Sequence, residues 1–350
     1  MLERLWCECL IRPQDLTPSH ESLEIVSVFN PGVADLGDDV LLLVRVAEKA
    51  RHTKPGTIAL PRWSPDEGMV IDELPVEERL LSDPRVVILE NGATRLTFIS
   101  HLRVVRLKHG RTVECVEEGI LRPATMYETY GVEDPRITKI GDTWWITYVA
   151  VSMHGACTAL ASTRDFVTFE RHGIIFPPEN KDVVLFPEKI DGQYVALHRP
   201  NPSTHFAPPE MWLARSPDLI HWGGHERFLG ADSDWAAGRV GGGTPPIRTE
   251  RGWLTLYHGN DKKVGVAGVG RYFGAALLLD VDDPGRIIAH TPEPILAPQM
   301  TFETTGFVPN VVFPTGLVER DDTLLIYYGA ADTVTAAVEV RRDDLMNALR

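Results

Sequence analysis

A strand–turn–strand pattern that recurs along the chain is the feature that most limits how these 350 residues can fold. In each copy a short hydrophobic strand leads to a two-residue turn, then to a strand rich in aromatic and β-branched residues, and then to a polar residue. Such runs, punctuated by Gly, Pro and Asp, are typical of all-β folds. The copies cover residues 134–152, 183–200, 244–260 and 311–332, and a further copy covers 29–49.

The spacing of the turns predicts the architecture. We place the turns at Gly141-Asp142, Asp191-Gly192, Arg251-Gly252 and Asp321-Asp322, which are 50, 60 and 70 residues apart. Each interval has room for about four short strands, the content of one β-propeller blade. The sequence therefore predicts a five-bladed β-propeller, an all-β fold whose inner strands converge on a central channel. We expect one catalytic domain over 1–350, with the propeller in 25–340 and the active site in the channel.

A second repeat agrees with the first. Residues 161–169 and 214–222 align without a gap, and each contains an Asp (Asp165, Asp218) followed four residues later by an aromatic residue. We expect both to be outer-strand turns of successive blades. Residues 83–105 also resemble the first pattern, so six blades are an alternative. We predict five, with this stretch as an enlarged outer part of the first blade.

The net charge of the chain limits which molecules it can bind. The chain has 35 basic and 49 acidic residues, a formal charge of −14. Such a surface repels nucleic acids and anionic membranes, although a local cluster of cations can still bind a small anion. The four cysteines lack zinc-type spacing and disulfide density, and the N-terminus lacks a signal-peptide pattern, so we expect reduced thiols and a cytoplasmic location. The apolar runs are too short to span a membrane.

Polar residues near the ends of the repeated inner strands should meet at one pocket. Carboxylates and cations that converge in this way suit glycosyl transfer, in which an acid protonates the leaving oxygen while a nucleophile attacks the anomeric carbon. The candidates are Asn30, Arg45, Glu133, Asp134, Arg136, Lys181, Asp182, His198, Arg199, Arg239, His258, Asn260 and Asp332.

Several of these candidates lie in motifs that resemble glycoside hydrolase family 130. The motifs are VEDPRIT (132–138), residues 180–200, GGGTPPIRTERGWLTLYHG (241–259), GFVPNVVFPTG with YYGAADT (306–333), and FNPG with an Arg fifteen residues after its Asn. The resemblance runs in order from about residue 25 to 340. It implies a five-bladed propeller that cleaves β-mannosides with inversion. Most such enzymes are phosphorylases that release α-mannose 1-phosphate, and a minority are hydrolases.

The resemblance also implies roles for individual residues. Asp134 is the expected general acid, with its proton relayed through a mannose hydroxyl. Asn30, Arg45 and Asp332 are expected to hold the mannose that is transferred, and Glu133, Arg136 and Asp182 are further expected substrate contacts. The expected phosphate site is Lys181, Arg199, Arg239 and His258. Arg239 departs from the Lys expected there, and a guanidinium fork binds phosphate differently from an ammonium group.

Two rival functions remain open at the sequence level. A β-mannosidase would use water and would need a carboxylate base about 6.5–9.5 Å from the acid; Glu303 and Glu133 are spare carboxylates for that role. A non-catalytic carbohydrate-binding propeller would need a degraded site. We expect no metal and no cofactor beyond phosphate as co-substrate, and a homo-oligomer is left open. The linkage and the acceptor sugar are not predicted, although residues 50–130 should shape the acceptor side.

Some motifs have simpler structural interpretations. An Asp-Pro pair such as Asp134-Pro135 commonly caps a turn. A histidine such as His198, at the end of an aromatic strand, is more often structural than a ligand. The run Gly241-Gly242-Gly243 lacks the Lys-Ser/Thr and the helix of a nucleotide-binding loop, so it indicates backbone freedom beside the pocket.

Overall fold

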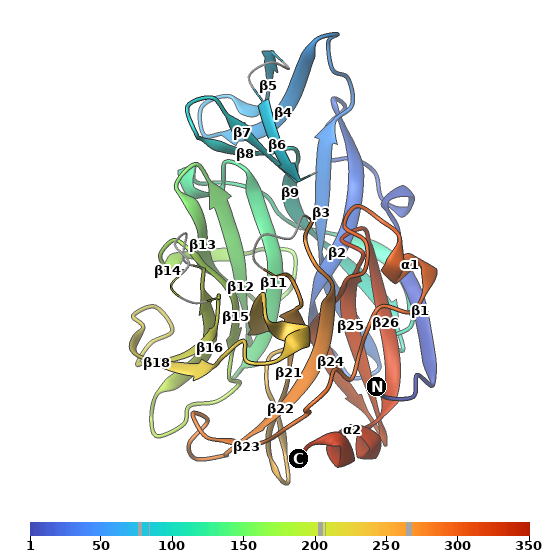
Figure 1. Ribbon diagram of the computed structural model, residues 1–350, viewed down its shortest axis with the longest axis vertical. Coiled ribbons are helices and arrows are strands. Elements are labelled where there is room, and N and C mark those ends of the chain that lie inside the picture. Colours follow the sequence, from blue (N-terminus) through green and yellow to red (C-terminus); the bar gives the residue numbers. More distant parts are fainter. Residues whose placement is uncertain (76–78, 84, 202–205, 207, 264–267) are drawn as a thin grey trace.

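The structure is a computed structural model that describes residues 1–75, 79–83, 85–201, 206, 208–263 and 268–350, with only the backbone of 79–83 considered (Figure 1). This part of the chain is nearly all β, as predicted. Its two α-helices are short: α1 (Thr301–Thr304) and α2 (Arg342–Ala348). No helix among the described residues is long and apolar enough to cross a membrane.

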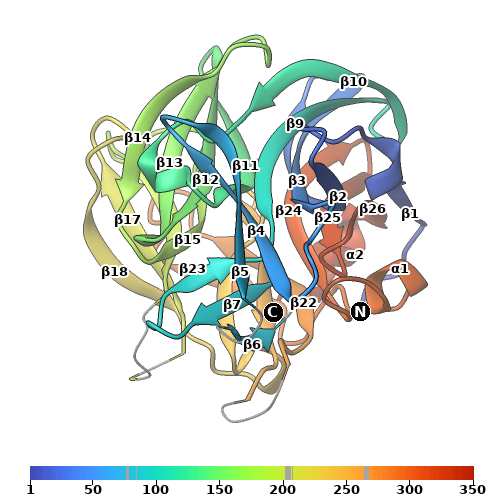
Figure 2. The ribbon, with the colours of Figure 1, turned by 90° about the horizontal axis from the view of Figure 1, so that it is seen from above.

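Most strands of the described residues belong to five antiparallel units that follow one another around the molecule (Figure 2). The first unit contains β2 (Leu23–Asp35), β3 (Asp39–Ala50), β9 (Ile99–Lys108) and β10 (Thr112–Leu121). The second contains β11 (Gly131–Ile140), β12 (Thr143–Ser152), β13 (Gly155–Thr163) and β14 (Glu170–Phe176). A single parallel pairing, Gly131 with Ser100, joins these two units into one eight-stranded sheet.

The remaining units are separate sheets. The third contains β15 (Asn180–Leu185), β16 (Tyr194–Pro200), β17 (Met211–Ser216) and β18 (Gly223–Leu229). The fourth contains β19 (Arg239–Gly242), β20 (Ile247–Thr249), β21 (Gly252–Asn260), β22 (Tyr272–Leu279) and β23 (Ile287–His290). The fifth contains β24 (Val312–Arg320), β25 (Thr323–Ala330), β26 (Val334–Arg341) and the N-terminal strand β1 (Trp6–Ile11), which pairs with β26.

Five hydrophobic clusters lie between neighbouring units. They join the first unit to the second, the second to the third, the third to the fourth, the fourth to the fifth, and the fifth back to the first. In the last of these, Val28 and Leu42 of the first unit pack with Leu325 and Tyr327 of the fifth, and all four are fully buried. Both faces of each sheet are therefore covered, because every unit has two neighbours.

The positions of the hairpin turns confirm most of the sequence reading. Cross-strand pairs enclose three of the four predicted turns: Ile140 with Thr143, Ile190 with Gln193, and Arg320 with Thr323. The fourth prediction was one residue late, because Thr249 pairs with Gly252 and the turn is Glu250-Arg251. Gly252 is needed for another reason: a Cβ there would lie 2.2 Å from the carbonyl oxygen of Leu279.

The two aligned Asp segments form the same structure in successive units, between β13 and β14 and between β17 and β18. In the first, one carboxylate oxygen of Asp165 accepts hydrogen bonds from the backbone N–H groups of Val167 and Thr168, at 2.9 Å each. Asp218 does the same one unit later, at 2.8 and 2.9 Å. These backbone donors stabilise the carboxylate and lower the pKa of Asp165 to about 2.

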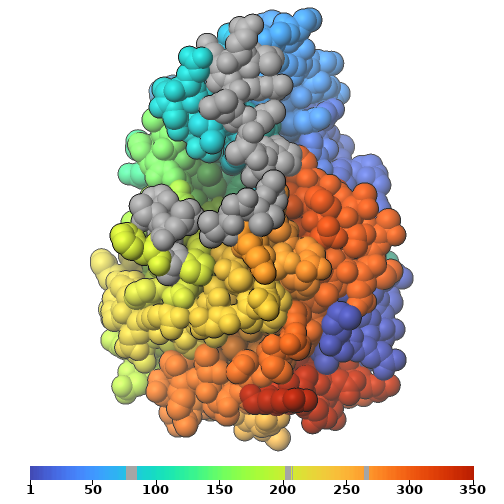
Figure 3. Space-filling view, viewed as in Figure 1, coloured from blue at the N-terminus to red at the C-terminus, as the bar shows by residue number. Residues whose placement is uncertain are grey.

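An insertion between β3 and β9 stands above the five units at the upper end of the molecule (Figures 1 and 3). It contains the hairpin of β4 (Thr57–Ser64) and β5 (Gly68–Pro75), and a sheet of β6 (Arg79–Asp83), β7 (Val86–Leu89) and β8 (Thr94–Leu96). The predicted outer part of the first blade is thus only partly right. From the stretch 83–105, β9 joins the first unit, but β7 and β8 pair with β6 instead.

Candidate active site

A β-bulge places one polar residue at the same position in the innermost strand of each of the first three units. The ladder skips two residues after Phe29, after Glu133 and after Lys181. The skipped pairs begin with Asn30, Asp134 and Asp182, whose φ angles are +47°, +47° and +56°. Asn and Asp adopt this left-handed backbone more readily than other non-glycine residues, and bulges re-aim side chains next to active sites.

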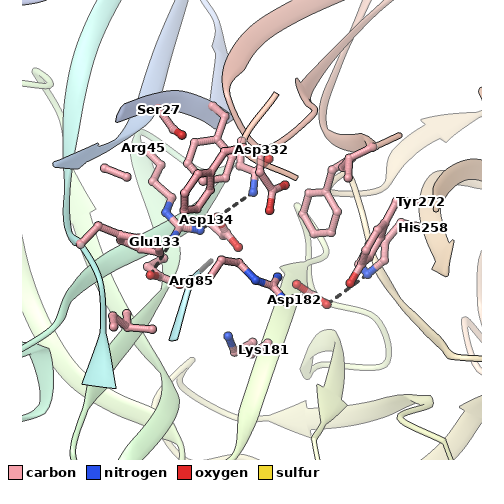
Figure 4. A pocket seen from close by; sticks show the side chains of 18 of the residues that line it. Ser27, Arg45, Arg85, Glu133, Asp134, Lys181, Asp182, His258, Tyr272 and Asp332 are labelled. Carbon is pink, nitrogen blue, oxygen red and sulfur yellow. Dashed lines mark hydrogen bonds and ion pairs between the residues drawn. The ribbon is translucent and has the colours of Figure 1, made fainter. Parts of the chain in front are cut away.

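These three side chains line a cavity of about 260 Å³, close to the lower limit of small-ligand sites. Residues from all five units and from the insertion form its wall (Figure 4). Ten of the eleven predicted site residues line it: Asn30, Arg45, Glu133, Asp134, Lys181, Asp182, Arg199, Arg239, His258 and Asp332. Most are almost completely buried, so their charges act at low effective dielectric.

On one side of the cavity, Arg45 holds two adjacent carboxylates. Its guanidinium donates to Glu133 Oε1 at 2.6 Å and to Asp134 Oδ1 at 2.9 Å. Asn30 Nδ2 donates to the same Asp134 oxygen at 2.9 Å. The Arg45 guanidinium also lies over the ring of Phe29, 4.5 Å from its centroid. This arrangement fixes Asp134 through Oδ1, and Asp134 is the less buried of the two carboxylates.

The two aspartates of this side titrate in opposite directions. Burial opposes ionisation of Asp134, but the charges of Arg45 and Arg136 and the Asn30 hydrogen bond outweigh it, so the pKa lies below its usual value. Asp332 lies after β25, with less compensation from cations. Burial raises the pKa of Asp332 to about 6, and Arg85 and Arg45 act against that rise. The site thus combines an ionised Asp134 with a carboxyl, Asp332, whose pKa is about 6.

On the other side, a carboxylate organises the cations. Arg199 donates to Asp182 Oδ2 through Nε at 2.8 Å and through a terminal nitrogen at 2.7 Å. His258 Nε2 lies 3.3 Å from the same oxygen. Burial opposes ionisation of Asp182, but Arg199 and His258 hold its pKa well below the usual range, whereas burial lowers the pKa of His258. Lys181 and Arg239 complete this side, and Arg239 Nε has no hydrogen-bond partner within the described residues.

The glycine run is explained by close packing against this carboxylate. A Cβ on Gly241 would lie 2.4 Å from Asp182 Oδ2 and 2.7 Å from His258 Nε2. On Gly242 it would lie 2.6 Å from the Asp182 carbonyl oxygen. Glycine is therefore needed because β19 passes directly beside the Asp182 bulge. The expected backbone freedom is not what requires it, since neither of these glycines has a positive φ angle.

Arg136 is the one predicted site residue that does not line the cavity. It is buried beneath, where its guanidinium donates to the carbonyl oxygens of Gly243 at 2.5 Å and Asp134 at 2.9 Å. Arg136 thus does not line the cavity, and its expected contact with substrate stays a prediction. The bulge at Asp134 explains the difference, because it shifts the ladder and turns the next side chain toward the neighbouring unit. Arg136 ties the acid's backbone to the glycine run.

Three other candidates also lie outside the cavity. Glu303 accepts hydrogen bonds from Arg4 at 2.7 Å and from Tyr328 at 2.6 Å, so it anchors the N-terminal segment. His198 stacks on Phe176, with ring centroids 4.6 Å apart, as its structural interpretation predicted. Burial, with the neighbouring His225, lowers the pKa of His198 to about 3. The amide of Asn260 donates to the backbone carbonyls of Val269 and Arg271.

The sequence reading missed other lining residues, above all Arg85, Leu96 and Phe98 from the insertion and its junction with β9, and Tyr272 from β22. The stretch 83–105 resembles the repeat, but that resemblance did not single out these residues, because their place at the cavity depends on how the insertion folds over the units. Tyr272 begins a hydrophobic strand, YFGAALLL, that carries no polar motif of the kind used to select candidates. Among the described residues no group of three His, Cys, Asp or Glu side chains could hold a metal ion.

Comparison with known proteins gives a consistent result. A family model described as beta-1,4-mannooligosaccharide phosphorylase, of the Glyco_hydro_130 family, matches residues 74–350. The chain is 40% identical to a beta-1,2-mannobiose phosphorylase of Listeria innocua, over 97% of this chain and 96% of that protein. The structure of a Listeria innocua beta-1,2-mannobiose phosphorylase in complex with beta-1,2-mannobiose superimposes with a TM-score of 0.90.

A second relative is more distant. The chain is 36% identical to a 1,2-beta-oligomannan phosphorylase of Thermoanaerobacter, over 71% of this chain and 81% of that protein. Both the family model, which covers more than half of the chain, and the near full-length relative point to the same assignment. This chain belongs to glycoside hydrolase family 130.

Proposed function

We propose that this protein is an inverting β-mannoside phosphorylase that cleaves β-1,2-linked manno-oligosaccharides with inorganic phosphate. The observation that carries the proposal is the pairing of one reactive carboxylate, Asp134, with a group of cations in the same cavity. Lys181, Arg199, Arg239 and His258 supply the donors and positive charge that a phosphate dianion needs in a pocket. The β-1,2 linkage follows from the 40% identical relative.

In this mechanism a phosphate oxygen attacks the anomeric carbon of the terminal mannose from the cation side. The bond from that carbon to the glycosidic oxygen breaks, and the leaving oxygen receives a proton that originates at Asp134, relayed through a mannose hydroxyl. Asn30, Arg45 and Asp332 hold the mannose. The products are α-mannose 1-phosphate and a mannoside one unit shorter, so atoms and charge balance.

Binding of phosphate provides a reason for Asp134 to take up the proton it must donate. Arg45 and Arg136 hold the pKa of Asp134 below its usual value. A phosphate dianion bound to Lys181 and Arg199 would offset part of that positive charge and bring a like charge near the carboxylate, and both effects raise a carboxyl pKa. The acid is therefore primed in the complex with phosphate.

The hydrolase alternative lacks support from the carboxylates named for it. Glu303 is bound to Arg4 and Tyr328 away from the cavity, and Glu133 is held by Arg45 at 2.6 Å. Neither is placed as a free base for water. The relatives named above are also called phosphorylases.

Product analysis tests the proposal. The protein is incubated with β-1,2- and β-1,4-mannobiose, each with and without phosphate. We expect mannose 1-phosphate from the β-1,2 substrate only when phosphate is present. Free mannose released at equal rates without phosphate would overturn the proposal in favour of hydrolysis. Faster phosphorolysis of the β-1,4 substrate would overturn the linkage alone.

We also propose that the five units are the blades of one β-propeller domain, located in the cytoplasm; because β1 pairs with β26, the units extend over 6–341 and not only over the expected 25–340. The cyclic order of the five hydrophobic clusters supports the propeller. The four cysteines are free thiols, which agrees with a reducing compartment.

A further inference from the structure

The insertion above the five units forms part of the cavity wall. Arg85, Val86 and Leu96 of the insertion line the cavity together with Phe98, which precedes β9. Arg85 and its insertion neighbours are only partly buried, whereas Asn30, Arg45 and Asp182 of the units are almost completely buried. The units thus form the floor of the cavity and the insertion forms its rim.

Figure 4 shows the Arg85 side chain extending over the cavity from this rim, in the direction of Asp134 and Asp182. Its charge also acts on Asp332 across the cavity, where it opposes the effect of burial on that carboxyl. Arg85 is therefore a cation that the insertion adds above a floor supplied by the five units.

Several contacts fix the insertion in place. Arg95 of β8 donates to the Leu60 carbonyl and lies 3.0 Å from Asp72 of β5, so the small sheet is tied to the β4–β5 hairpin. The hairpin is tied to the units, because the Trp63 N–H donates to the Thr129 carbonyl at 2.8 Å. The Arg95 guanidinium also lies 5.0 Å from the centroid of the Tyr130 ring. These contacts connect the insertion to the units, so the rim can hold a side chain in a fixed position.

We propose that Arg85 is a specificity-determining residue that binds the sugar on the leaving-group side of the cleaved bond, with Val86 and Leu96 forming the apolar wall beside it. The inference rests on the proposed function. The mannose that is transferred must lie at the floor, within reach of Asn30, Arg45 and Asp134. The rest of the substrate then extends toward the rim, where a guanidinium can donate to sugar hydroxyls through its planar fork. The ligand class is a neutral hexose or a short β-mannoside.

The test compares Arg85→Ala and Arg85→Lys with Lys54→Ala. Lys54 lies on the same insertion, its side chain is 75% exposed and it pairs with Glu73 at the surface. The substitution Lys54→Ala also removes one positive charge from the insertion, but at a residue that does not line the cavity, so it is the matched control. In the synthetic direction, with mannose 1-phosphate as donor, we expect Arg85→Ala to raise the KM for the acceptor sugar about tenfold or more. Arg85→Lys should give an intermediate value, because it keeps the charge and loses the fork.

The Michaelis constant for phosphate separates this role from its nearest rival. In phosphorolysis, Arg85→Ala should leave the phosphate KM within about twofold of wild type, a change at the level of a lost surface contact. A large rise in the phosphate KM with an unchanged acceptor KM would overturn the proposal and assign Arg85 to the phosphate site. Unchanged values for both would overturn it outright.

A binding measurement keeps the inference independent of turnover. Mannobiose is titrated into Asp134→Asn and into Asp134→Asn with Arg85→Ala, and heat is recorded. Binding about tenfold weaker in the double variant supports the role of Arg85, and equal binding overturns it. If wild type cleaves no β-mannoside with phosphate, the proposed function fails, while the titration still decides whether Arg85 binds the sugar.

Discussion

The same β-bulge occurs on two sides of the cavity, but the aspartate that it presents has a different role on each side. In the second unit the bulge presents Asp134, and in the third it presents Asp182. Each aspartate meets an arginine from the second strand of a unit, and these arginines occupy equivalent positions: Arg45 pairs with the residue before the first unit's bulge, and Arg199 with the residue before the third's.

The partner geometry separates the two carboxylates. Arg45 reaches Asp134 from a neighbouring unit, shares itself with Glu133 and bonds one oxygen of each. Arg199 belongs to the same unit as Asp182 and gives it two nitrogens. The side chain of Asp134 is 12% exposed and that of Asp182 is 2% exposed. A shared, partly exposed carboxylate can change its protonation state, whereas an enclosed one acts as a fixed anion that orients cations.

The sharpest test of this contrast is Asp134→Asn. The amide keeps the shape but cannot donate the proton, so kcat should fall by about a thousandfold or more, within the range for general acids. The melting temperature should stay close to that of wild type, because Asn30 and Arg45 can still bond the amide oxygen. Initial rates of mannose 1-phosphate release, with thermal unfolding alongside, measure both. Near-normal turnover would remove Asp134 from its role.

Asp182→Asn should mainly lower stability and weaken phosphate binding, whereas Asp134→Asn should mainly lower kcat. Removing one partner of a buried ion pair costs about 3–5 kcal/mol, so stability should fall well below that of Asp134→Asn. The phosphate KM should rise about tenfold or more, because Arg199 and His258 lose their common anchor. Denaturant unfolding and phosphate titration of initial rates provide the readouts. If Asp182→Asn lowers kcat at saturating phosphate as strongly as Asp134→Asn does, the distinction between Asp182 as a fixed anion and Asp134 as the general acid is wrong.

Asp332→Asn extends the comparison to pH. Burial raises the pKa of Asp332 to about 6 in the folded protein, above its unfolded value. The folded state therefore binds this proton more tightly, and the contribution of Asp332 to stability falls as pH rises from about 4 to about 6. An asparagine cannot ionise and should lack this loss. The free energy of unfolding of the variant, relative to wild type, should increase by about 2 kcal/mol between about pH 4.5 and pH 7.5. No relative change would show that Asp332 titrates normally.

The smallest expected effect comes from comparing the two histidines that end aromatic strands, His198 and His258. His198→Phe should leave kcat/KM within about twofold at neutral pH, because His198 packs away from the cavity and is neutral there. His258→Phe removes a cavity group beside Asp182 and should weaken phosphate use about tenfold. Parallel measurement of kcat/KM for phosphate compares them. Equal effects of the two substitutions would contradict the assignment of His258 to the phosphate site and of His198 to a structural role.

Local chemistry explains which features could be predicted from the sequence. Turn residues such as Gly141 and Asp321 mark hairpins because their backbone conformation is set by neighbours along the chain. The aligned Asp165 and Asp218 segments likewise repeat because each caps its own turn. Asn30, Asp134 and Asp182 stood out as polar residues at strand ends, and all three reach the cavity.

Features set by distant parts of the chain were harder to predict. Arg136 is two residues from the acid, yet the bulge turns it toward carbonyls of the fourth unit. Gly252 was placed in a turn, whereas it is needed by a strand that passes beside it. Arg85 reaches the cavity only because the insertion folds back over the units. Without knowledge of that packing, one arginine among many carries no signal.

The pairing of β1 with β26 has a consequence for biosynthesis. β1 precedes every other described strand along the chain and its partner β26 follows all of them, so β1 is synthesised well before β26 and lacks that partner while the strands between them are made. The closing step therefore joins contacts of the greatest sequence separation, which carry a high loop-closure entropy and slow folding. Until then β26 has an open edge, the kind of strand that recruits other chains. Deleting the residues of β1 should thus favour aggregation during expression, and a peptide of that sequence supplied in trans should suppress it.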